Sequence, residues 1–191
     1  LTLNGPGTLN VQGDFLSTTS EVPTGDVNLI FSGSGSQTIT LNTSTHLPDG
    51  TITINKPSGT VTLGSAVNVD SSGQDLNIIS GTLTNSSYLL TVNDLLNING
   101  TFDQGSGNVS ATGYSIGGLW TNTSTGDISV GSGGVSNNGN VSIGNPLTCG
   151  GADNIAITSS SGGTARPWTG NGRTRVYDAT VQDQAGGSTV I

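Results

Sequence analysis

The sequence predicts an all-β fold, a single-stranded right-handed parallel β-helix (β-solenoid) with three short strands in each coil of about 19–24 residues. Three observations support this prediction: a composition poor in helix formers, short runs of alternating polar and apolar residues, and a common spacing between those runs. Charged residues make up 8% of the chain, against about 25% in an average protein. Glycine contributes 31 residues and methionine none.

The alternating runs predict the individual strands. Threonine alternates with isoleucine, valine or leucine, the pattern of a strand with one buried and one exposed face. Gly and Asn between the runs favour turns, whereas no apolar stripe of helical period is present. The clearest runs span residues 38–41, 51–54, 60–63 and 82–84.

The spacing of the apolar residues predicts that the strands stack as coils. Three separate columns share one common step, the length of the repeat, as expected when each repeat is one turn of a solenoid. The columns are Ile39, Val61, Leu83 and Phe102; Ile54, Ile78 and Ile98; and Val67 with Leu90, accompanied by Val69 with Val92.

The chain divides into two regions on this pattern. Residues 1–150 are predicted to be β-helix coils, best supported at 25–104, with looser, glycine-rich corners after residue 105. Residues 151–191 are predicted to form an irregular final coil or cap. Because Thr189–Ile191 read as a strand, we expect this end to continue into a longer chain or to contact a subunit.

Residues 33–40 (GSGSQTIT), 51–64 (TITINKPSGTVTLG) and 80–84 (SGTLT) resemble the β-helix repeats of secreted bacterial surface proteins. The resemblance is to filamentous-haemagglutinin-like and autotransporter-passenger adhesins, and it covers about residues 25–145. It implies an elongated extracellular scaffold, secreted or held at the cell surface, and it carries no catalytic residues to transfer.

The titratable residues do not predict an enzyme. The twelve acids are scattered singly, although stacking of distant acids such as Asp75 and Asp94 would leave room for a polysaccharide-cleaving site. His46 is the only histidine and lies in a turn sequence, and Cys149 has no basic neighbour. We therefore expect no catalytic residue, metal or other cofactor.

One face of the predicted coil carries a threonine ladder. With the first apolar column pointing inward, Thr38, Thr60, Thr82 and Thr101 stack outward. Threonine is also a common outward strand residue whose hydroxyls pair along a ladder. An ice-binding surface is therefore an alternative to a plain exposed strand face.

Candidate contact residues occur near the end of the chain, where Trp168, Arg173 and Tyr177 lie in the most basic segment. Exposed aromatic rings stack on sugars, so a glycan-binding adhesin module is the main alternative function. The partners expected are further repeats or copies of the chain joined end to end, and possibly glycans. The net charge of −8 argues against nucleic acid, and no apolar run is long enough to span a membrane.

The sequence as a whole predicts a non-catalytic, extracellular structural or adhesive β-solenoid segment of a large surface protein or fibre. Glycan binding comes second. Ice binding and polysaccharide cleavage come third.

Overall fold

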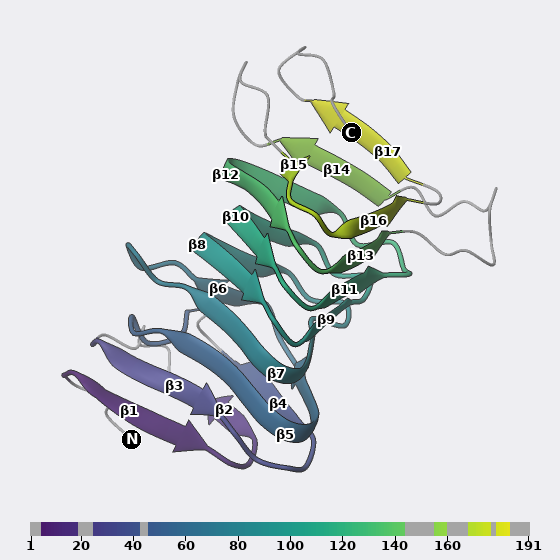
Figure 1. Ribbon diagram of the computed structural model, residues 1–191. Coiled ribbons are helices and arrows are strands. Elements are labelled where there is room, and N and C mark those ends of the chain that lie inside the picture. Colours follow the sequence, from purple (N-terminus) through teal and green to yellow (C-terminus); the bar gives the residue numbers. More distant parts are fainter. Residues whose placement is uncertain are drawn as a thin grey trace.

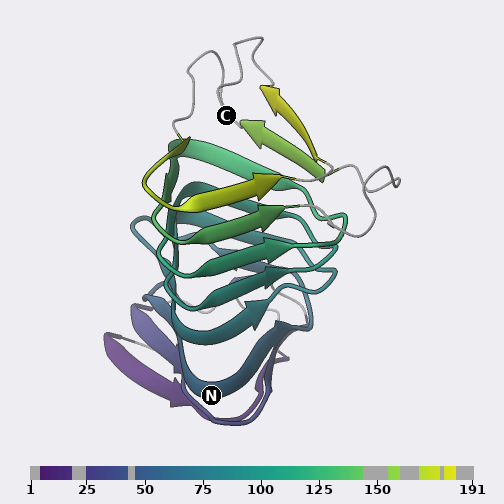
Figure 2. The same ribbon diagram turned by 45° about the vertical axis from the view of Figure 1, so that its right-hand side comes forward.

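The structure is a computed structural model that describes residues 5–18, 25–42, 46–143, 155–159, 168–176 and 179–183. Every regular element within these residues is a β-strand, and the registered strand pairs are parallel. The chain rises coil by coil from the N-terminal to the C-terminal end, in the right-handed sense (Figures 1 and 2). The predicted β-solenoid is therefore confirmed. Among the described residues there is no helix that could cross a membrane.

The strands stack in three columns, which we call faces A, B and C. Face A contains β1 (Gly7–Val11), β3 (Val27–Phe31), the beginnings of β5 (Ile52–Leu63) and β7 (Leu76–Thr84), the ends of β8 (Leu90–Ile98), β10 (Val109–Ile116) and β12 (Ile128–Asn137), and β15 (Trp168–Thr169). Face B contains β2 (Phe15–Ser17), β4 (Gln37–Leu41), the ends of β5 and β7, β9 (Thr101–Gln104), β11 (Leu119–Asn122), β13 (Asn140–Ile143) and β16 (Arg173–Val176). Face C contains β6 (Val67–Val69), the beginnings of β8, β10 and β12, β14 (Ile155–Ser159) and β17 (Ala179–Asp183).

Two of the three predicted apolar columns are correct throughout. Ile54 pairs with Ile78 and Ile78 with Ile98 on face A, and Val67 pairs with Leu90 on face C. The remaining column is wrong at its first step, because Val61 pairs with Gln37 and not with Ile39. Ile39 lies beside Leu63 instead, so this step is longer than the predicted one.

The coil does not loosen after residue 105, contrary to the expectation from its glycines. Phe102 pairs with Trp120 and Trp120 pairs with Val141, so these steps are no longer than those of the earlier coils. The steps lengthen only later, where Asn140 pairs with Arg173 and the chain between them exceeds the predicted repeat. The described part of 151–191 consists of β14 to β17, which extend the three faces.

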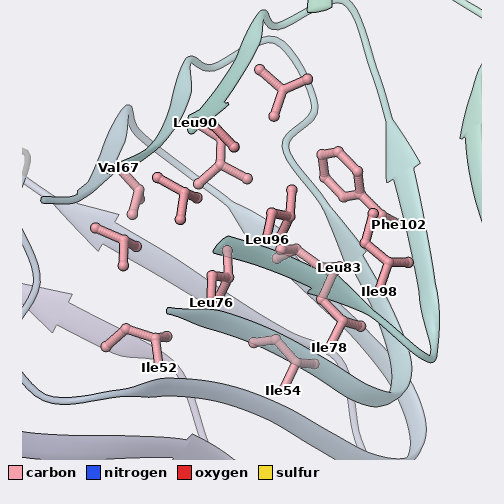
Figure 3. Close-up of a cluster of buried hydrophobic side chains, with 14 of the residues drawn as sticks. Ile52, Ile54, Val67, Leu76, Ile78, Leu83, Leu90, Leu96, Ile98 and Phe102 are labelled. Carbon is pink, nitrogen blue, oxygen red and sulfur yellow. The ribbon is translucent and has the colours of Figure 1, made fainter. Parts of the chain in front are cut away.

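The inward side chains form one continuous core along the axis (Figure 3). Leu29, Ile54, Ile78 and Ile98 are fully buried on face A, and Phe102 packs from face B. Each coil buries the apolar row of the coil below it, at roughly 25 cal/mol per Å² of apolar area. The stacked coils therefore stabilise one another.

Buried amides line the corner between faces B and C. Asn85 and Asn122 have no exposed surface and Gln104 is 1% exposed. Their amide nitrogens donate to corner carbonyls: Asn85 to Gly107 O at 2.9 Å, and Gln104 to Gly126 O at 3.0 Å. These bonds satisfy carbonyl groups that the turn leaves outside the strand ladder.

Candidate functional site

The candidate site lies on face B, where the outward side chains of successive strands form two columns. Thr60, Thr82 and Thr101 stack in one column, as predicted. Thr38 does not belong to it, because Thr38 pairs with Thr62 in the neighbouring column. A shift of two residues keeps every side chain on its own face, so the alternating pattern did not reveal the error.

The threonine column leads directly to one of the predicted contact residues. Above Thr101 the same column continues through Leu119 and Asn140 to Arg173. The second column runs through Thr62, Thr84, Asp103, Thr121, Ser142 and Arg175. The threonine ladder and the basic segment lie far apart in the sequence, but in the structure they share one surface (Figure 2, front strands).

A row of glycines at the corner between faces A and B sets the position of these strands. Gly100, Gly118, Gly139 and Gly172 lie one above the other, each directly before or near the start of a face B strand. A Cβ atom on Gly118 would lie 2.0 Å from Gly100 O, and one on Gly139 would lie 2.1 Å from Gly118 O. The corners are therefore tight, and they hold β9, β11, β13 and β16 in register.

Backbone hydrogen bonds across this corner reinforce the register. The amide of Asn140 donates to Gly118 O at 2.8 Å, and the amide of Arg173 donates to Gly139 O at 2.9 Å. Inside the corner, Asn137 Nδ2 donates to Arg173 O at 3.3 Å and to Thr174 Oγ1 at 2.9 Å. The backbone at Arg173 is thus anchored to the coil below it.

The upper end of face B contains a shallow hollow of about 310 Å³. Its lining residues come from three successive strands, namely Leu119, Asn140, Val141, Ser142, Arg173 and Arg175. Leu119 is 39% exposed, and the Arg173, Arg175 and Asn140 side chains are exposed. The hollow thus combines two cations with neutral polar groups and one exposed apolar side chain, that of Leu119.

Charge is distributed unevenly along face B. Asp103 interrupts the threonine rows and accepts a hydrogen bond from Thr121 Oγ1 at 3.0 Å. Neither Arg173 nor Arg175 forms an ion pair with a carboxylate of the described residues. The whole chain carries a net charge of −8. This end of face B, in contrast, carries two positive charges close together, and no described carboxylate is paired with either.

The side chains of the other two predicted contact residues lie outside the described part of the structure. The backbone of Trp168 lies in β15 on face A, where it pairs with Val135, and Tyr177 lies outside the described residues. Trp120 is wholly buried, with its ring 4.9 Å from the ring of Tyr114 and 5.8 Å from that of Phe102. Trp120 therefore belongs to the core.

His46 is part of the coil and not only of a solvated turn. It forms an isolated parallel bridge with Asn68 on face C, and its Nδ1 lies 2.5 Å from Asp70 Oδ2. This pair joins two successive coils. Cys149 lies outside the described residues.

The predicted example of stacked acids does not occur. Asp75 precedes Leu76, which pairs with Leu96, so Asp75 lies opposite Leu95 and its Oδ1 accepts the amide hydrogen of Leu95 at 3.2 Å. Within the described ranges, no three His, Cys, Asp or Glu side chains come together as they would around a metal ion.

Comparison of the chain with protein-family models, with curated proteins and with solved structures gives no match. The resemblance to bacterial adhesin repeats therefore stays a prediction, and any function must be argued from the face itself.

Proposed function

We propose that this chain is a non-catalytic structural segment of an extracellular or cell-surface protein, a stiff β-solenoid whose side is available for adhesion. The observation that carries the proposal is the continuous core, over which each strand of faces A and B after the first coil pairs in parallel with the coil below. A bend between coils would have to break parallel hydrogen bonds and expose apolar side chains at the same time. Such a solenoid holds the groups at its two ends at a fixed separation.

The surface chemistry supports the same proposal. Outward positions on the three faces are mostly Ser, Thr and Asn, as in the face C column of Asn68, Thr91, Ser110 and Ser129. These side chains are short and neutral. They suit a scaffold that is wet on its outside and stable without many ion pairs.

The stiffness is tested by the distance between two spin labels. Ser34 and Ser132 are exposed and lie several coils apart, so both are replaced with Cys in a Cys149→Ser background. The proposal predicts one narrow distance distribution that does not change with salt. A broad or salt-dependent distribution would show that the coils move independently and would contradict a structural role.

The absence of catalysis is tested separately. The full chain is incubated with a panel of neutral and acidic polysaccharides, and new reducing ends and unsaturated uronate products are measured. We expect neither product. Release of either product would show that the solenoid is a polysaccharide-cleaving enzyme.

A further inference from the structure

We infer that the upper end of face B is a binding site for an acidic polysaccharide, with Arg173 and Arg175 as the groups that recognise its carboxylate or sulfate. The site rests on the proposed function, because it gives a ligand class to the side of the solenoid that is available for adhesion. It follows from the geometry of β16 and from the composition of the two strands below it.

The two guanidinium groups are arranged as a pair. Arg173 and Arg175 are separated by one residue on β16, so both side chains leave the same side of the strand with Cα atoms roughly 6.6 Å apart. The Asn140 side chain lies directly below Arg173 and Ser142 lies below Arg175. The pair is therefore fixed by the strand, and only the side-chain rotamers need to be ordered when a ligand binds.

The arginines are available to a ligand because the described strands of face B offer them no competing acid within reach. The nearest acid in the Arg175 column is Asp103, three strands below, about 14 Å away at the usual strand spacing. That distance exceeds the screening length at physiological salt. Of the other basic residues, Lys56 is buried, and Arg166 lies outside the described residues.

The composition of the hollow favours a sugar polymer over other anions. A guanidinium binds a carboxylate or sulfate through two parallel hydrogen bonds. Asn140 and Ser142 offer amide and hydroxyl groups to sugar hydroxyls, and the exposed Leu119 offers a surface to the apolar face of a sugar ring. Thr121 beside Leu119 on β11 and Thr101 directly below Leu119 continue the polar surface along the axis.

The charge of the chain argues against polymers and surfaces that carry denser charge. Double-stranded DNA carries one charge per about 1.7 Å, and an anionic membrane presents a continuous charged plane, so a chain of net charge −8 is repelled more strongly by either than by a polymer with one charge per sugar. A polysaccharide with one acidic group on every sugar or every second sugar has neutral hydroxyls between its charges. Such a polymer is complementary to a surface on which two cations are surrounded by Ser, Thr and Asn side chains.

The test measures binding of the full chain to immobilised polygalacturonate and chondroitin sulfate, with neutral dextran as the reference polymer. Arg173→Gln/Arg175→Gln is expected to weaken binding at least about tenfold, since two charge-assisted contacts are lost. Ser132→Asp/Ser136→Asp is the matched control, because it lowers the net charge by the same two units at exposed positions of β12, away from face B. The control is expected to bind within about twofold of the original chain.

Several outcomes would overturn the inference. They are no binding to either acidic polymer, equal binding to dextran, equal weakening by the Ser132/Ser136 control, and tighter binding to vesicles containing phosphatidylserine than to either acidic polymer. Arg173→Lys/Arg175→Lys keeps the charge and loses the planar fork, and is expected to fall between the original chain and the Gln variant. Circular dichroism and urea unfolding of the same proteins show whether each solenoid is intact. Stiffness is measured on the spin-labelled chain, which keeps both arginines, so loss of binding and loss of stiffness are separate results.

Discussion

Lys56 is the only lysine of the chain and is buried, with 1% of its surface exposed. Its Nζ donates to Gly33 O at 2.6 Å and to Gln37 Oε1 at 2.5 Å. Gln37 in turn donates from Nε2 to Gly13 O at 2.6 Å. These contacts connect three successive coils at the corner between faces A and B. We predict that Lys56→Met destabilises the fold although methionine fills a similar volume.

The expected loss of unfolding free energy follows from the two acceptors that lose their hydrogen-bond donor. In Lys56→Met, Gly33 O and Gln37 Oε1 both lose their donor in a buried place, and each costs roughly 1–3 kcal/mol. Removal of a buried cation offsets part of that cost. We therefore expect a net loss of about 2–4 kcal/mol, with the largest effect on the coils formed by β1 to β5.

The assay is urea unfolding followed by circular dichroism, in a cycle of Lys56→Met, Gln37→Leu and the double variant. A coupling free energy of about 1.5–3 kcal/mol is expected, as for a hydrogen bond with a charged donor. A Lys56→Met variant as stable as the original chain, or a coupling free energy below about 0.5 kcal/mol, would refute the reasoning.

The same residue predicts a pH dependence. Burial lowers the pKa of Lys56 below its usual value of 10.5. Between that lowered pKa and 10.5 the unfolded chain binds more protons than the folded chain, so stability should rise with pH in this window. Lys56→Met should remove that rise, and a variant that keeps it would assign the effect to another group.

Trp120→Ala should lower the free energy of unfolding by about 3–5 kcal/mol and Trp120→Phe by clearly less, measured by urea unfolding, because the ring is wholly buried between two aromatic neighbours. Gly118→Ala should cost about 1–3 kcal/mol because its Cβ would lie 2.0 Å from Gly100 O. Gly13→Ala is the control, since nothing lies within 4 Å of its Cβ position, and equal losses in both would contradict the tight corner. Thr82→Val, on the outside of face B, should change stability by no more than about 0.5 kcal/mol, and a larger loss would mean that the threonine hydroxyls stabilise the coil.

The threonine column below the hollow could be predicted from the sequence, because strand alternation and repeat length are local properties. The column of Thr60, Thr82 and Thr101 is correct for this reason. The position of Arg173 above them could not be predicted, since the step from Asn140 to Arg173 is longer than the repeat that the earlier coils share. Only the stacking of β16 on β13 brings the basic segment onto the threonine face.

The sequence by itself determined the fold class. Apolar residues such as Ile54, Ile78 and Ile98 recur at the repeat length, and this recurrence is visible without knowledge of which other residues pair. It did not determine the first register on face B, where pairing Val61 with Ile39 or with Gln37 gives the same inward and outward pattern. The tertiary structure decides that register. Gln37 must lie inside the coil to meet Lys56 Nζ, and a buried cation requires acceptors that an isoleucine cannot provide.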